Sequence, residues 1–186
     1  MAGEQAGCGS MHPDNVTPSL YGGFILARSA QPPDIVRLPV PDGLACAVLH
    51  PRMEIETGTA RQLVGEQVRL QDATRQWANV GGLVAALYTG DLALLSRSLV
   101  DHVAEPKRAA LVPGLADVKA AAIAAGALGC SLSGSGPSIF ALAATLELAN
   151  DVGKAMQEAF SRQSPIGSDL WVCLLGKQGA RVVSAR

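Results

Sequence analysis

Apolar side chains recur every three or four positions through the middle of the chain, which is the spacing of an amphipathic helix. Trp77, Val80, Val84, Leu87 and Tyr88 follow this period up to Gly90, a residue type suited to ending a helix. The same spacing predicts helices over residues 57–63, 92–99, 115–122 and 148–160, and a short helical turn over residues 15–21 with Asp14 as its N-cap.

Short apolar runs bounded by turn residues predict the strands. They cover residues 24–27, 35–38, 45–49, 138–142 and 170–175, with an edge piece at 181–183. We expect strands 35–38 and 45–49 to pair around a turn at residues 41–43, and residues 30–34 to form a linker. Strands, a block of helices, and then strand, helix and strand predict an α+β fold. Its helices would cover one face of an antiparallel sheet.

Composition narrows the class of protein. Hydrophobic residues make up 48% of the chain and charged residues 17%, which excludes a mainly disordered protein. A net charge of -1 offers no excess of Lys and Arg to neutralise nucleic-acid phosphates. No apolar run reaches the roughly 18 residues that span a bilayer. The first ten residues lack signal-peptide features and the four cysteines are scattered, so we expect a cytoplasmic protein with reduced thiols.

The most distinctive polar segment is Gly-Cys-Ser-Leu-Ser-Gly-Ser-Gly-Pro-Ser over residues 129–138, expected between a helix and a buried strand. Glycine lets the backbone approach a ligand, and successive N–H groups in such a loop form an anion-binding concavity. The candidate phosphate or substrate loop consists of Ser133, Gly134, Ser135 and Gly136. A tight turn that merely needs glycine explains this composition equally well. The loop is not a Walker-type phosphate loop, because no Gly-Lys-Ser/Thr follows it.

Two polar groups near the first half of the chain carry candidate binding chemistry. His12, Asp14 and Asn15 bring an imidazole, a carboxylate and an amide together, which suits an ammonium and a hydroxyl. A plain helix cap at Asp14 is the simpler explanation of that cluster. Thr57 and Arg61 lie four residues apart on one predicted helix, so their hydroxyl and guanidinium share a face and suit a carboxylate.

Other polar residues give weaker indications. Residues 105–108, Glu-Pro-Lys-Arg, follow a helical run, and an ordinary charged loop would also explain them. His50 and His102 have no metal-ligand spacing, so we expect both to be structural or exposed. No metal site is predicted in this chain.

Taken together, these segments resemble the signature motifs of homoserine kinases. These enzymes belong to the GHMP superfamily, named for the galactose, homoserine, mevalonate and phosphomevalonate kinases. The resemblance covers the chain from about residue 10 onward. It rests on residues 11–24 (MHPDNVTPSLYGGF), 57–61 (TGTAR), 107–108 (KR), 111–114 (LVPG) and 133–138 (SGSGPS), in this order.

The resemblance implies a kinase that converts ATP and L-homoserine into ADP and O-phospho-L-homoserine, in threonine biosynthesis. It also implies a GHMP-kinase C-terminal domain with a ferredoxin-like core over residues 31–186, after a remnant of the nucleotide-binding domain over residues 1–30. The family's ATP loop, Pro-x-x-x-Gly-Leu-Gly-Ser-Ser, does not occur in this sequence, and neither does its magnesium-coordinating carboxylate. We therefore expect a C-terminal part of the enzyme, whether a fragment, a chain with a misplaced start or one of two split chains. ATP and Mg²⁺ would serve the complete enzyme, as a homodimer or with a separate N-terminal half.

The family also implies a role for each matching residue. Arg61 and Arg108 would bind the substrate carboxylate. Asp14 would bind the ammonium and Asn15 the reacting hydroxyl, and His12 and Thr57 would complete the pocket. Residues 133–136 would lie near the substrate or the transferred phosphoryl group. Asn15 and Arg108 are the expected catalytic residues.

Alternatives stay open at this point. The chain as written lacks the ATP-binding elements, so a non-catalytic fragment fits the sequence, as does an amino-acid-binding regulatory α+β domain that needs no nucleotide. Another GHMP kinase is a third possibility. Two arginines favour an amino-acid carboxylate over the hydroxyl array of a sugar, which argues against a galactose kinase.

Overall fold

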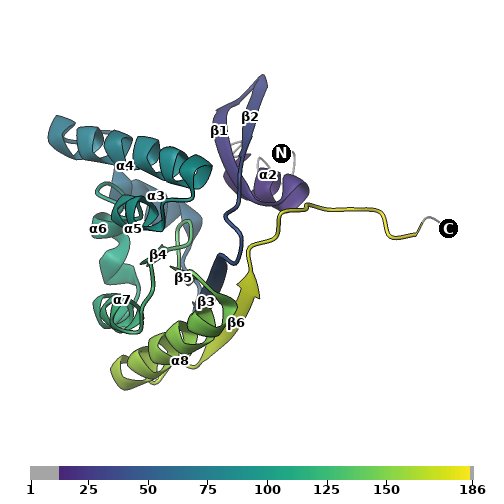
Figure 1. Ribbon diagram of the computed structural model, residues 1–186. Helices are drawn as coiled ribbons and strands as arrows, with labels where there is room; N and C mark the ends of the chain where they lie inside the picture. The colour runs from purple at the N-terminus through teal and green to yellow at the C-terminus, as the bar shows by residue number, and fades with distance from the viewer. Residues whose placement is uncertain (1–12, 185–186) are drawn as a thin grey trace. The chain divides into compact units, whose positions relative to one another are not determined.

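The computed structural model describes residues 13–184, which divide into two compact units (Figure 1). Unit 1 contains the described residues 13–42 and 175–184, and unit 2 contains Gly43–Leu174. The chain therefore leaves unit 1, builds unit 2 and returns to unit 1.

Unit 1 begins with a helix and a β-hairpin. α2 (Pro13–Tyr21) ends before Gly22, which adopts a φ of 70°, a left-handed conformation that glycine enters without strain. β1 (Phe24–Ala30) and β2 (Pro33–Leu38) then pair antiparallel, with a shift in register between Ala27 and Ser29. Two residues between the strands make the turn, so this sheet is a tight hairpin.

The C-terminal segment packs back onto this helix and hairpin. The N–H of Gly23 donates to the carbonyl of Gly176 at 2.7 Å, and the N–H of Ala180 donates to the carbonyl of Leu20 at 3.0 Å. Unit 1 is therefore made of both ends of the described chain.

Unit 2 is built on a four-stranded sheet with the order β4-β5-β3-β6. The strands are β3 (Ala45–Pro51), β4 (Gly129–Leu132), β5 (Ile139–Ala143) and β6 (Ser168–Leu174), and each neighbouring pair is antiparallel. Ala45 at the start of β3 pairs with Leu174 at the end of β6.

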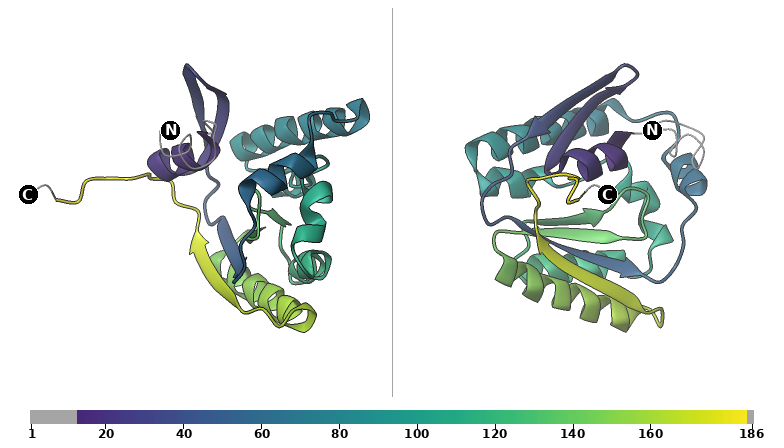
Figure 2. Two further views of the ribbon diagram at one scale, coloured as in Figure 1. Left: turned by 180° about the vertical axis from the view of Figure 1, so that it is seen from behind. Right: turned by 90° about the vertical axis from the view of Figure 1, so that its right-hand side faces the viewer.

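The helices of unit 2 complete a β-α-β-β-α-β order (Figure 2). Between β3 and β4 lie α3 (Thr57–Val64), α4 (Leu70–Thr89), α5 (Leu92–Ser98), α6 (Glu105–Arg108), the 3-10 turn η1 (Ala109–Leu111) and α7 (Leu115–Ala124). Between β5 and β6 lies α8 (Leu146–Gln163). This order and the strand arrangement confirm the predicted ferredoxin-like α+β fold.

The core of unit 2 lies between the sheet and the pair α7 and α8. Val152, Met156 and Phe160 recur every four residues along α8 and are fully buried. They pack with the alternate β3 residues Ala47 and Leu49, whose side chains point to the same face of the sheet. They belong to one buried cluster with residues of α7, so aliphatic side chains fill most of the interior of unit 2 around Phe160.

Several sequence predictions about local structure are wrong. Asp14 is not the N-cap of its helix, because α2 begins at Pro13 and Asp14 lies inside its first turn. Residues 30–34 are not a linker, since Ala30 pairs with Pro33 across the hairpin turn. Residues 181–183 form no edge strand and have no regular structure.

Two strand predictions also need correction. Residues 35–38 and 45–49 do not pair with each other: the first pairs with β1 in unit 1, and the second lies in β3 between β5 and β6. Gly129–Leu132 is strand β4 rather than the start of a loop, so only residues 133–138 connect it to β5. Backbone pairing with β5 overrides the poor strand propensity of glycine and serine there.

The division into units differs from the expected boundary after residue 30. That boundary would separate β1 from β2, which the structure pairs in one sheet. The origin of residues 1–30 in a nucleotide-binding domain stays a prediction.

Candidate functional site

Arg108 connects three segments of unit 2 that the sequence singled out separately. Its Nε–H donates to the carbonyl of Ala60 in α3 at 3.0 Å, and its Nη1–H donates to the carbonyl of Gly134 at 3.0 Å. The half-buried Arg108 side chain of α6 therefore connects the helix that carries Arg61 to the Gly/Ser loop.

The Gly/Ser loop is a tight hairpin connection between β4 and β5. The N–H of Ser133 donates to the carbonyl of Ser138 at 2.8 Å, and the N–H of Gly136 donates back to Ser133 at 3.0 Å. Gly134 and Gly136 have φ values of 60° and 82°, so glycine is needed at both positions. Within residues 13–184, the N–H groups of Gly134 and Ser135 donate no hydrogen bond, which leaves them for an anionic ligand.

α3 carries the two residues predicted to share a helix face. Thr57 is half-buried at its first position and Arg61 is exposed one turn later, next to the Ala60 carbonyl that binds Arg108. A hollow of about 660 Å³ is lined by Gly58, Arg61, Gln62, Gly65 and Glu66. Neither Thr57 nor Arg108 lines this hollow, and the link between Arg108 and the helix of Arg61 is the bond to the Ala60 carbonyl.

Glu105 anchors the start of α6 to the end of β4. Its carboxylate accepts hydrogen bonds from the Ser131 hydroxyl and, at 3.3 Å, from the N–H of Leu132. It also pairs with the ammonium of Lys119 in α7, and the Glu105 side chain is only 11% exposed. Sequence reasoning missed this role, because a charged residue in a short polar segment usually lies in solvent.

Two further neighbours of the site were also missed. Lys107, in the segment that an ordinary charged loop would also explain, donates from Nζ to the carbonyl of Val64 at the end of α3. His50 is half-buried, with Nδ1 2.9 Å from the hydroxyl of Ser138 at the base of the loop. Because Leu49 pairs with Ile139, His50 and Ser138 lie one position beyond the ladder of β3 and β5, so strand register was the signal that would have brought these two together.

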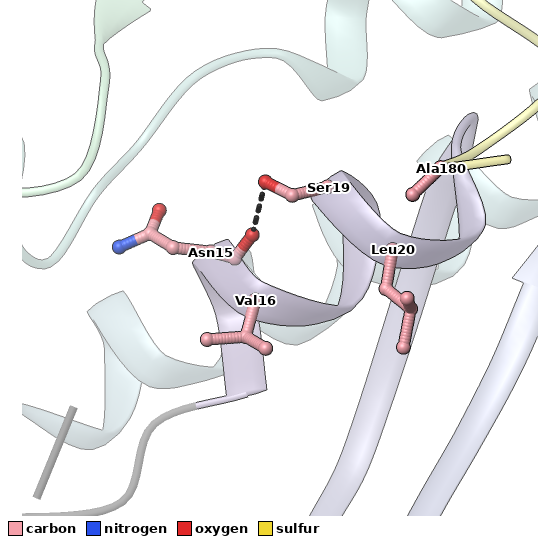
Figure 3. Close-up of a pocket in the computed structure, with 5 residues that line it drawn as sticks. All are labelled: Asn15, Val16, Ser19, Leu20 and Ala180. Atoms are coloured by element: carbon pink, nitrogen blue, oxygen red, sulfur yellow. Dashed lines mark hydrogen bonds between the residues drawn. The ribbon is translucent and has the colours of Figure 1, made fainter. Parts of the chain in front are cut away.

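The other predicted substrate residues lie in unit 1. Asp14 and Asn15 are exposed in the first turn of α2. Asn15 lines a hollow of about 480 Å³ with Val16, Ser19, Leu20 and Ala180, where the Ser19 hydroxyl donates to the Asn15 carbonyl at 2.9 Å (Figure 3). His12 lies outside the described residues. The structure describes this group and the Arg108 group as parts of separate units, so their joining in one pocket stays a prediction.

Two of the three described thiols are buried, at Cys46 and Cys130. Burial raises the pKa of the Cys46 thiol to about 12, and burial likewise raises the pKa of Cys130 in β4 to about 12. Among residues 13–184, no three His, Cys, Asp or Glu side chains gather closely enough to hold a metal ion. No helix in this part of the chain is long and apolar enough to cross a bilayer.

Comparisons with known sequences show that this chain is similar to GHMP kinases and, among them, to homoserine kinases. The family model of the GHMP kinases C terminal matches residues 83–162. A homoserine kinase of Chlorobium phaeovibrioides is 52% identical over 182 residues, which are 97% of this chain and 57% of the relative. A homoserine kinase of Pyrococcus abyssi is 41% identical over 95% of this chain and 58% of its own length. The chain therefore spans somewhat more than half the length of these relatives.

Comparisons with solved structures likewise show similarity to a homoserine kinase. The crystal structure of homoserine kinase from Cytophaga hutchinsonii has a TM-score of 0.92 and 52% identity, covering 96% of this chain and 56% of that one. An L. major mevalonate kinase in complex with R-mevalonate has a TM-score of 0.69 at 21% identity, which shows a shared fold alone.

Proposed function

Because residues 83–162 match a GHMP kinase C-terminal domain and nearly the whole chain is similar to homoserine kinases, we propose that it is the C-terminal part of a homoserine kinase. The complete enzyme would transfer the γ-phosphoryl group of ATP to the hydroxyl of L-homoserine, in threonine biosynthesis. The enzyme would work mainly by positioning and by stabilising charge, as is usual in phosphoryl transfer.

The anchored guanidinium of Arg108 is the observation that carries this proposal. An arginine has five N–H donors, and Arg108 uses one at Nε and one at Nη1 for backbone carbonyls. Three donors remain on a side chain that is already ordered, so a substrate carboxylate meets a preformed binding group. Arg61, next to the Ala60 carbonyl, would supply a second guanidinium to the same carboxylate.

The other residues would position the remaining parts of homoserine. Asp14 would attract the ammonium, Asn15 would orient the hydroxyl that receives the phosphoryl group, and Thr57 would complete the pocket with His12. The N–H groups of Gly134 and Ser135 would lie near the substrate or the transferred phosphoryl group, since unpaired amides stabilise developing negative charge.

Among the described residues, no three His, Cys, Asp or Glu side chains gather as a metal cluster would require. The hairpin loop contains no lysine for ATP phosphates. We therefore assign the binding of ATP and Mg²⁺ to residues of the complete enzyme other than residues 13–184, and derive no catalytic step from them.

A fusion to the N-terminal part of the Chlorobium phaeovibrioides relative tests the proposal. We expect the fusion to phosphorylate homoserine with ATP, whereas the chain alone should bind ATP negligibly in calorimetry. Homoserinol, which keeps the hydroxyl and ammonium but lacks the carboxylate, should be a poor substrate. No activity of a folded fusion would favour a non-catalytic or regulatory domain.

Arginine variants of the fusion test the carboxylate assignment. Arg108→Ala should lower kcat/KM for homoserine. The loss should correspond to about 2–5 kcal/mol of transition-state binding free energy, the range for truncating one partner of a buried charge pair. Arg61→Ala should act in the same direction, and the double variant should be less than additive because both groups address one carboxylate. Lys107→Ala is the matched control, since Lys107 bonds to Val64 rather than to substrate. If Arg108→Ala keeps the preference for homoserine over homoserinol, the assignment is wrong.

A further inference from the structure

Two cysteines of unit 2 occupy paired positions on neighbouring strands. Cys46 in β3 pairs with Cys173 in β6, in the antiparallel ladder that joins these two strands (Figure 1). Side chains at paired positions stand next to each other on the same face of a sheet. The two thiols are therefore neighbours, although they lie near opposite ends of unit 2 in the sequence.

The spacing of paired positions suits a disulfide bond. Paired residues of antiparallel strands have Cα atoms about 4.5–5.5 Å apart. Disulfides bridge Cα atoms that are about 4.4–6.8 Å apart. The register of β3 and β6 therefore brings the sulfurs of Cys46 and Cys173 within reach of each other while the ladder stays intact.

The pair lies on the face of the sheet away from α7 and α8. Ala45 and Ala47, on either side of Cys46 in β3, belong to the buried clusters on the helix-covered face, so Cys46 points to the other face. Cys130 packs in the same cluster as Ala47 and so points toward the helices. Among the three described cysteines, only Cys46 and Cys173 therefore share a face.

The two thiols of this pair differ in exposure. β6 lies at the edge of the sheet and Cys173 is exposed, so a small oxidant can reach its sulfur from solvent. Cys46 is only 8% exposed, and burial raises the pKa of its thiol to about 12, which makes it a poor first nucleophile. Its attack on an already activated neighbouring sulfur is favoured by proximity, because that step is intramolecular.

We propose that Cys46 and Cys173 form a redox-modification site that closes into a reversible cross-strand disulfide, with a low-molecular-weight disulfide such as glutathione disulfide as the oxidant. The Cys173 thiolate attacks one sulfur of the oxidant, and the other sulfur leaves as a thiolate that takes up the Cys173 proton. Cys46 then loses its proton and attacks the Cys173 sulfur, displacing the second glutathione, which takes up that proton. Two protein thiols are thereby oxidised by two electrons, and one glutathione disulfide is reduced to two thiols.

The disulfide joins the strand by which the chain enters unit 2 to the strand by which it leaves. Unit 2 begins at Gly43 and ends at Leu174, so both cysteines lie close in sequence to one of its ends. Because β6 is an edge strand, paired on one side only, the cross-link prevents it from separating from β3. The bond also closes almost the whole of unit 2 into a loop, which raises thermal stability. The proposal does not depend on the proposed kinase activity.

Peptide mapping without reductant tests the proposal in the 186-residue chain carrying Cys8→Ser, which removes the cysteine outside the described residues. After incubation with glutathione disulfide, free thiols are blocked with N-ethylmaleimide under denaturing conditions. We expect the peptides of Cys46 and Cys173 to be joined within one chain, and Cys130 to be recovered as a blocked thiol. The midpoint temperature of unfolding should rise by about 5 °C or more on oxidation and fall back with dithiothreitol.

The double variant Trp171→Cys with Cys173→Ser is the matched control. Trp171 is exposed on the same strand and the same face, but it pairs with Val48 and so lies diagonally from Cys46. Diagonal neighbours are about 7–8 Å apart, beyond the reach of an unstrained disulfide. This variant should form the intramolecular disulfide at least about 10-fold more slowly than the native pair. Circular dichroism checks that it is folded.

Several results would overturn the proposal. They are glutathione retained on Cys173 with Cys46 left as a free thiol, a disulfide that uses Cys130 or joins two chains, and equal cross-linking by the control variant. An unchanged midpoint temperature after complete oxidation would contradict the fixing of β6 to β3.

Discussion

Two charged side chains at the ends of α6 explain how a four-residue helix positions a binding group. Glu105 fixes the first residue to β4, and Arg108 fixes the last to α3 and the hairpin loop. A helix this short has little stability of its own, so these side chains supply its order. The geometry of the candidate site therefore depends on groups that need not touch substrate.

Glu105→Ala should destabilise the chain by about 2–4 kcal/mol, because it leaves the largely buried Lys119 ammonium and the N–H of Leu132 without their partner. Ser131→Ala should cost about 1 kcal/mol, for one lost hydrogen bond. Urea unfolding measures both. Glu158→Ala, an exposed glutamate on α8, should change stability by less than about 0.5 kcal/mol. Equal effects of Glu105→Ala and Glu158→Ala would show that the buried pair is not stabilising.

The three described cysteines should differ sharply in reactivity. Cys46 and Cys130 are buried, with pKa values raised by burial to about 12, while Cys173 is exposed. At pH 8 iodoacetamide should modify Cys173 and leave the other two intact, as peptide mapping would measure. Both thiols ionise near pH 9 once unfolded, so their contribution to stability should fall as pH rises from about 9 to about 12. Modification of Cys46 before Cys173 would contradict this ranking.

At the scale of elements, strong periodicity was predictable and strand pairing was not. The four-residue steps of Val152, Met156 and Phe160 predicted α8 and its buried side. The Gly and Ser residues of β4 do not predict a strand, because this strand is stabilised by its backbone pairing with β5. Strands close in sequence usually pair, which is why the sequence predicts that residues 35–38 pair with β3, whose neighbours in the structure lie far along the chain. Likewise, spacing predicted Arg61 as a site residue, but the carbonyl partners of Arg108 follow only from the folded chain.

Two adjacent glycines of α4 should respond oppositely to alanine. A Cβ at Gly81 meets open space, so Gly81→Ala should stabilise the chain by about 0.5–1 kcal/mol through helix propensity. A Cβ at Gly82 would lie 2.4 Å from the Ser98 hydroxyl, so Gly82→Ala should destabilise it by about 1–3 kcal/mol. Thermal unfolding of each variant measures the change in stability. Destabilisation by Gly81→Ala would mean that this position is packed.

At the scale of the whole molecule, the two units differ in the elements and the buried hydrophobic core that each contains. Unit 2 contains the complete β-α-β-β-α-β order and the buried cluster of α7, α8 and the sheet. Unit 1 contains one helix, one hairpin and a segment without regular structure. Isolated two-stranded hairpins are marginal in water, so unit 1 needs further support that unit 2 does not.

A fragment of residues 43–174 should therefore fold on its own. We expect a cooperative thermal transition and a circular dichroism spectrum of mixed helix and strand. Residues 13–42 alone should lack a cooperative transition, since they lack the C-terminal segment that bonds to Gly23 and Leu20. A fragment 43–174 that is unfolded at 25 °C would show that the core of unit 2 is not sufficient.

Because Ala45 pairs with Leu174, the first and the last strand residues of unit 2 lie at the same end of two neighbouring strands. A short glycine-serine bridge would therefore join residues 43 and 174 without bending either strand. New ends could then be opened in the exposed connection between α3 and α4, outside every strand ladder. Such a circular permutant should keep the sheet, and the same adjacency makes residues 43–174 a cassette that can be grafted into a surface loop of another protein.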